Sequence, residues 1–159
     1  MTHQPDGEIL IIFVDNQFGV LTRITAMIRR EGFNMHTLTV APTADPQVSR
    51  VTIHLDSRQR DLTQLLHRLS RMDCVRRAQR YSADTQVSRG LLLAKLPVQC
   101  QKELEALAGE YPYRFVSRDS RSILVEFSGD SQQMNGFAAA IAPMNPLEVA
   151  RTGLVTMEY

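Results

Sequence analysis

The sequence has no tryptophan, few cysteines and no long apolar run. Its two cysteines, Cys74 and Cys100, lie far apart and match no metal-ligand spacing, so we expect neither a disulfide framework nor a metal site. No apolar run is longer than the one over residues 9–14, whereas a membrane-spanning helix needs about 20 such residues. The N-terminal MTHQPDGE lacks the basic start and apolar stretch of a secretory signal. These absences predict a reduced, cytoplasmic protein with no membrane partner.

An excess of charge of either sign is also missing. Eighteen Lys and Arg residues against 17 Asp and Glu give a formal net charge of +1. A nucleic-acid reader usually carries a strong basic excess or patch, so we expect no nucleic-acid partner. The small basic cluster of Arg76, Arg77 and Arg80 is interpreted as a solvated face.

Motifs of known catalytic chemistry are absent as well. The sequence contains no GxSxG, P-loop or GxGxxG pattern. None of its four histidines is spaced as a metal ligand, and His54 falls on the polar side of an expected strand, where it should be solvated. We therefore expect no catalytic residues, no metal and no bound cofactor in this chain.

The first half of the chain has the periodicities of an alternating α and β protein. Apolar residues at helical spacing predict a helix over 20–30, with Gly32 as its stop, and a second helix that begins at Asp61. The segment 48–55 alternates apolar and polar residues, which is typical of a half-buried strand. Strands are expected over 9–14, 33–40, 48–55 and 75–81. The resulting order is β-α-β-β-α-β.

The second half repeats this order after a polar segment, 82–87, that we interpret as a linker. It has expected strands over 91–98, 113–117, 123–127 and 147–157 and helices over 101–109 and 134–141. The prediction is an α+β protein of two ferredoxin-like βαββαβ sandwich domains, 1–81 and 88–159. The strand over 9–14 is too apolar for a wet face, so we expect side-by-side or face-to-face dimerisation.

The turn Asp15–Gly19 opens directly onto the first helix. Free N–H groups at a helix start, together with the positive end of the helix dipole, bind carboxylates. Gly19 allows close approach of the backbone, and Asn16 offers both donors and an acceptor to a zwitterion. A second asparagine, Asn34, begins the next strand. In a dimer, one chain's turn and the neighbour's strand are then able to share a small amphiphilic ligand. An ordinary Asx turn and helix start is the alternative interpretation.

Three motifs around this turn resemble the opening of one protein family. They are N-x-x-G-x-L-x-R, G-F-N-M-x-x-L-T-V and a P-T…S-R stretch. The matching residues are Asn16, Gly19, Leu21, Arg23, Gly32, Phe33, Asn34, Met35, Leu38, Thr39, Val40, Pro42, Thr43, Ser49 and Arg50. The segment EVARTG, residues 148–153, resembles the family's closing strand. The family is the regulatory (small) subunit of acetolactate synthase, also called acetohydroxyacid synthase.

The resemblance implies that the first domain is an ACT domain, which pairs side by side with a second copy and binds valine at the interface. The implied ligand-binding residues are Asn16, Gly19, Val20 and Leu21 from one chain and Asn34 and Met35 from the other. The implied supporting positions are Thr22, Thr39 and Ala41. The second domain is implied to help dock or activate the catalytic large subunit, which binds thiamine diphosphate, Mg²⁺ and FAD and condenses pyruvate with pyruvate or 2-oxobutyrate.

The sequence departs from the family pattern at two notable positions. Phe18 stands where a small residue or proline is common, and Gly90 stands where glutamate is common. Two other functions remain as alternatives. One is a free-standing ACT amino-acid sensor that controls another enzyme. The other is an acylphosphatase-type enzyme that uses Arg23 and Asn34, although the phosphate-cradling loop of such an enzyme is missing.

Overall fold

The computed structural model describes residues 7–56, 62–81 and 86–158. By contacts, these residues divide into an N-terminal unit, 7–86 together with 156–158, and a C-terminal unit, 87–155. The expected start of the second helix at Asp61 and most of the expected linker lie outside the described residues; strand β5 begins at Gln86. No helix within the described ranges is long and apolar enough to cross a membrane.

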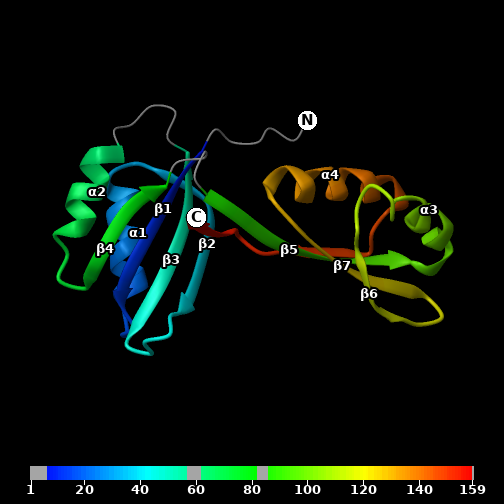
Figure 1. Cartoon of the computed structure of the whole chain (residues 1–159), viewed down its shortest axis with the longest axis horizontal. Helices are drawn as coiled ribbons and strands as arrows, with labels where there is room; N and C mark the ends of the chain where they lie inside the picture. Colours follow the sequence, from blue (N-terminus) through cyan, green and yellow to red (C-terminus); the bar gives the residue numbers. More distant parts are fainter. Residues whose placement is uncertain (1–6, 57–61, 82–85, 159) are drawn as a thin grey trace. The chain divides into compact units, whose positions relative to one another are not determined.

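The N-terminal unit is a four-stranded antiparallel sheet with two helices on one face (Figure 1). Its strand order is β2-β3-β1-β4. The elements are β1 (Gly7–Asp15), α1 (Val20–Arg30), β2 (Asn34–Pro42), β3 (Val48–Asp56), α2 (Leu62–Ser70) and β4 (Val75–Tyr81). Gly32 ends α1 as expected, because its φ of 75° is in the left-handed region that favours glycine.

The C-terminal unit repeats the same plan. The order of its main strands, β6-β7-β5-β8, corresponds strand for strand to that of the first sheet, and β9 pairs with β5 outside this path. The elements are β5 (Gln86–Pro97), α3 (Gln101–Ala106), β6 (Arg114–Arg118), β7 (Ser122–Gly129), α4 (Ser131–Ile141) and β8 (Glu148–Arg151), with short 3-10 turns at Val98–Cys100 and Ala142–Met144. The last strand, β9 (Val155–Glu158), begins in this unit, and its residues 156–158 belong by contacts to the N-terminal unit. The predicted pair of βαββαβ sandwiches is therefore confirmed.

Each unit has its own core. In the first, Leu10 and Ile12 of β1 and Val51 and Ile53 of β3 pack against the apolar stripes of α1 and α2. In the second, a cluster of aromatic rings lies at the centre; the Phe127 and Phe137 ring centroids are 4.7 Å apart and nearly parallel. Because each core is closed by its own helices, each sandwich satisfies the burial needs of its sheet separately.

Two expectations from the sequence were wrong. The single final strand over 147–157 is two strands, β8 and β9, because Leu154 turns into the C-terminal core while Thr156 belongs to the N-terminal unit. The polar side of β3 is also not solvated: Thr52 is 4% exposed and His54 is half-buried. Burial lowers the pKa of His54, with a smaller contribution from nearby His36.

Candidate amino-acid site

The turn between β1 and α1 is held in place by the hairpin that joins β2 and β3. The Asn16 backbone N–H donates to the Gln47 carbonyl at 2.8 Å, and the Asn16 side-chain amide donates to the Pro46 carbonyl at 3.0 Å. Arg76 of β4 contacts Asp15 at 2.8 Å. These bonds hold the turn against the β2–β3 hairpin and β4. They use the Asn16 N–H groups, so the Asn16 side-chain oxygen is available to accept a hydrogen bond from a ligand.

Gly19 is the N-cap of α1, with a φ of 77° and no neighbouring atom within 4 Å of an added Cβ. The position therefore requires a left-handed backbone but has open space in front of it. The Val20 N–H contacts the Gln17 carbonyl at 3.4 Å, and the Arg23 N–H bonds the Gly19 carbonyl at 3.0 Å. The amides of Leu21 and Thr22 have no acceptor within the helix, because they lie in its first turn.

The side chains of this turn divide into two groups. Val20 is 5% exposed and packs in the core, so only its backbone is available to a ligand. Leu21 is 40% exposed, and Asn16 and Thr22 are exposed as well. Phe18 is fully exposed on the same turn. The turn therefore combines first-turn amides, an asparagine oxygen and apolar side chains on an open surface.

Asn34 and Met35, the residues implied to contact the ligand from the other chain, lie far from the turn. Asn34 pairs with Asp56 at the last position of β3, whereas Asn16 bonds Gln47, just before β3 begins. At a rise of roughly 3.3 Å per residue, Gln47 and Asp56 are about 30 Å apart, the length of β3. Asn34 is exposed, and neighbouring Met35 is half-buried against the core. One chain therefore places the two groups of predicted residues at opposite ends of β3.

The supporting positions lie on β2. Thr39 pairs with Thr52 and Ala41 pairs with Arg50, so both face away from the helices, while Val51 and Ile53 face the core. The Thr39 hydroxyl is buried and has no hydrogen-bond partner among the described residues.

The pair proposed for an acylphosphatase-type reaction is not assembled. Arg23 lies in the first turn of α1 and forms an ion pair with Asp73, which lowers the pKa of that carboxyl group. Asn34 lies beyond the other end of the same helix. Across the described ranges, no group of three or more His, Cys, Asp or Glu residues is placed to hold a metal ion.

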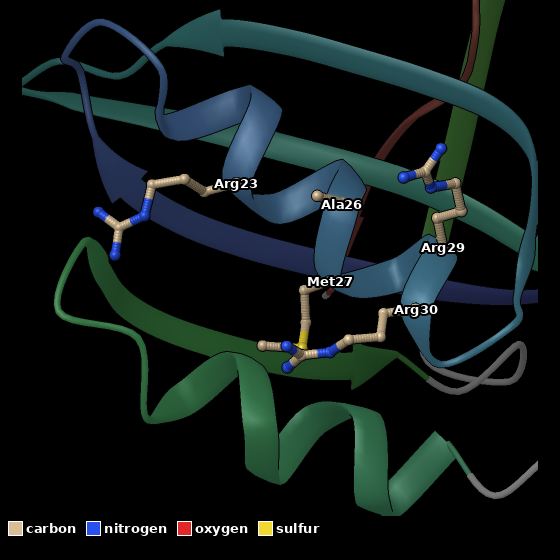
Figure 2. A pocket seen from close by; sticks show the side chains of 5 residues that line it. All are labelled: Arg23, Ala26, Met27, Arg29 and Arg30. Carbon is tan, nitrogen blue, oxygen red and sulfur yellow. The ribbon is translucent and has the colours of Figure 1, made fainter.

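A separate basic groove runs along α1 (Figure 2). It is lined by Arg23, Ala26, Met27, Arg29 and Arg30. The Arg30 and Met27 side chains lie together, with the guanidinium 3.1 Å from the sulfur, whereas Arg29 points to the other side of the helix. No residue of the predicted amino-acid site lines this groove.

Sequence reasoning missed the residues that hold the turn in place. Arg76 contacts both Asp15 and Asp45, the latter at 3.5 Å, and these contacts raise the pKa of its guanidinium. The sequence interpretation of this arginine as part of a solvated face was therefore incomplete. The contacts join residues 31 and 61 positions apart, so no local pattern indicates them.

The fold and the turn define a class of protein: a chain with an ACT-type domain followed by a second sandwich of the same topology. Residues 10–77 match the model of the "AHAS small subunit-like ACT domain", and residues 89–159 match that of the "Small subunit of acetolactate synthase". The Escherichia coli acetolactate synthase isozyme 3 small subunit is 30% identical over 150 residues, which cover 92% of each chain. This chain belongs to the family of acetolactate synthase small subunits.

Other relatives agree with this assignment. The acetolactate synthase small subunit of Haemophilus influenzae is 28% identical over 152 residues, covering 94% of this chain and 93% of that protein. The crystal structure of the acetolactate synthase small subunit from Thermotoga maritima superposes with a TM-score of 0.88 at 20% identity, covering 96% of this chain and 97% of that one. The likeness to that structure supports the fold.

Proposed function

We propose that this chain is the regulatory subunit of an acetolactate synthase in branched-chain amino-acid biosynthesis. It binds valine where two ACT domains meet, passes feedback inhibition to the catalytic large subunit and activates that subunit when valine is absent. The names of its relatives support a partnership with a catalytic subunit. One observation supports the valine site most directly. The Asn16 turn and the Asn34–Met35 end of β2, called here the two half-sites, lie too far apart within one chain to hold one small ligand.

A second copy of the chain is able to unite the half-sites. Strand β2 is an edge of its sheet, and its side chains Leu38 and Val40 are 38% and 43% exposed. Two β2 strands that pair antiparallel about a two-fold axis place the Asn34 end of one beside the opposite end of its partner. The hairpin at that opposite end holds the Asn16 turn. The symmetry creates two identical composite sites.

The sequence argument for a dimer changes accordingly. Ile9 and Ile11, on the outward side of β1, are 6% and 0% exposed within the single chain. Their burial therefore gives no reason for face-to-face pairing. The exposed apolar edge at β2 supports the side-by-side arrangement instead.

The chemistry of the composite site fits a small zwitterion with a branched side chain. The carboxylate accepts hydrogen bonds from the Leu21 and Thr22 backbone N–H groups and is attracted by the α1 dipole. The ammonium donates hydrogen bonds to the side-chain oxygens of Asn16 and Asn34. Leu21 from one chain and Met35 from the other contact the isopropyl group. The backbone of Gly19 and Val20 completes the wall. In this proposal the chain itself binds no cofactor; thiamine diphosphate, Mg²⁺ and FAD belong to the catalytic subunit.

Calorimetric titration of the purified chain with valine, leucine, isoleucine and glutamate tests the proposal. We expect saturable binding of a branched-chain amino acid and no binding of glutamate. Asn16→Ala removes a hydrogen bond to a charged group, typically worth about 1.5–3 kcal/mol, and should weaken binding about 10- to 100-fold. Gln17→Ala, the exposed neighbour, is the matched control and should leave the affinity unchanged.

Reconstitution with an acetolactate synthase large subunit provides the second readout. Activation without valine and inhibition with valine are expected. If no branched-chain amino acid binds in either form, the valine site is wrong. If valine binds but the enzyme neither gains activity nor responds, the chain is a free-standing sensor instead.

A further inference from the structure

The face of the first sheet opposite α1 and α2, called here the outer face, is buried at its centre by the chain itself, whereas Ala41 and Arg77 on the same face are exposed. On it, Ile11 pairs with Thr52, and their side chains are 0% and 4% exposed. Phe13 pairs with Arg50 on the same face, and the guanidinium carbon lies 5.9 Å from the Phe13 ring centroid. An alternating strand of this kind ordinarily leaves such a face to water.

The segment that reaches this face is the C-terminal strand β9. Thr156 is fully buried, and residues 156–158 belong by contacts to the N-terminal unit. The Arg50 guanidinium donates a hydrogen bond to the Thr156 carbonyl, although 106 positions separate the two residues. Arg50 is thus held between an aromatic ring of β1 and the backbone of β9.

Several buried polar atoms on the outer face have no hydrogen-bond partner among the described residues. These atoms are the Nε of Arg50, the Nε2 of His54 and the hydroxyl oxygen of Thr39. Buried polar atoms without partners oppose the burial that creates them.

Arg50 is also close in the chain to the candidate amino-acid site. The Asn16 turn is bonded to Gln47, and Arg50 follows three positions later on β3, paired with Ala41. The boundary between the two units falls inside β9, at the Val155–Thr156 bond, so β9 continues directly from the C-terminal unit. One strand, β3, therefore connects the amino-acid turn to the segment that leads into the other unit.

We propose that Arg50 is a positioning residue that fastens β9 to the outer face of the ACT sheet and thereby makes the C-terminal unit respond to occupancy of the Asn16 turn. The coupling half of this inference rests on the function proposed above; the fastening half does not.

Hydrogen–deuterium exchange of the full-length chain tests the fastening. In Arg50→Gln, amide exchange in residues 155–158 should rise at least about tenfold, because loss of the bond to the Thr156 carbonyl lets β9 separate from the sheet more often and exposes its amides. Arg50→Lys keeps a donor and should restore part of the protection. Arg77→Gln is the matched control: Arg77 also pairs with Phe13, from β4, and is exposed. Unchanged exchange in Arg50→Gln would overturn the fastening.

Reconstituted enzyme tests the coupling. Arg50→Gln should bind valine with an affinity within about twofold of the original chain but require at least about tenfold more valine for half-inhibition. Removal of residues 155–159 should have the same effect, and the combined variant should show no further change, because both act on one interaction. If Arg50→Gln fails to fold, the deletion of residues 155–159 tests the coupling on its own.

The outcomes separate the two proposals. If Arg50→Gln shows faster amide exchange in β9 but is still inhibited by valine as the original chain is, the proposed coupling is wrong. If the original chain binds no valine, the proposed function and the coupling fall together, while the exchange data still decide whether Arg50 fastens β9.

Discussion

Replacement of Gly19 by aspartate places a negative charge at the point where the ligand carboxylate is expected. No atom lies within 4 Å of the added Cβ, so the substitution causes no steric clash. The φ of 77° does carry a backbone cost, roughly 1–2 kcal/mol for a residue other than glycine and less for asparagine or aspartate. Gly19→Asn is therefore the matched control, since it has the same size and the same backbone tolerance without the charge.

The size of the charge effect follows from Coulomb's law. Two unit charges about 5 Å apart repel by roughly 0.8 kcal/mol in water and 3.3 kcal/mol at an effective dielectric constant of 20. The site is exposed in one chain and partly enclosed in the proposed dimer, so the expected loss of valine affinity lies between about 4- and 250-fold. The negative charge also favours the start of α1 by about 0.3–1 kcal/mol, which offsets part of the backbone cost.

Calorimetry, thermal denaturation and reconstituted enzyme measure the three consequences. Valine binding should weaken in Gly19→Asp relative to Gly19→Asn, while the two melting temperatures stay within about 4 °C. The Asp variant should still activate the catalytic subunit but should no longer be inhibited by valine. If both variants bind valine with equal affinity, no ligand carboxylate lies at the start of α1.

Three further predictions concern the core, the pH response and the sheet edge. Gly90→Ala should destabilise the chain by about 1–3 kcal/mol in urea denaturation, because the new Cβ would lie 2.5 Å from the buried Met134 sulfur. Burial lowers the pKa of His54, so the unfolded chain binds its proton more readily and stability should fall as the pH drops below about 6.5. His54→Gln should reduce the dependence of the free energy of unfolding on pH in that range. An unchanged dependence would mean that other titratable groups cause it. Val40→Lys on the β2 edge should yield monomers in analytical ultracentrifugation, whereas Arg77→Glu on the opposite edge strand should not; a dimer that survives Val40→Lys does not use β2.

Local patterns predicted most of the elements because helices and strands have short periods. The stripe at Ile24 and Ile28 and the stop at Gly32 lie within a few turns of one another, so the sequence shows them directly. The final strand could not be predicted in the same way. The alternation over 147–157 contains no sign that Leu154 and Thr156 pack in different units, because both are ordinary members of an apolar and polar pattern.

The candidate site likewise has one part with a local sequence pattern and another part that depends on long-range contacts. The motif around Asn16 and Gly19 is local, and its residues were identified from spacing and resemblance. The separation of Asn16 from Asn34 depends on the register of β2 and β3, which only the folded sheet defines. The support given by Arg76 depends on a contact across 61 residues and has no local signal.

Hydrophobic periodicity and short motifs were sufficient to predict the two βαββαβ sandwiches and the family, because both kinds of pattern are encoded within a few residues of each other. Only the folded sheet shows that Asn16 and Asn34 lie at opposite ends of β3, about 30 Å apart at a rise of roughly 3.3 Å per residue. The tertiary structure also decided that β9 returns to the first sheet, because the bond between Arg50 and Thr156 joins residues whose proximity exists only after the chain has folded.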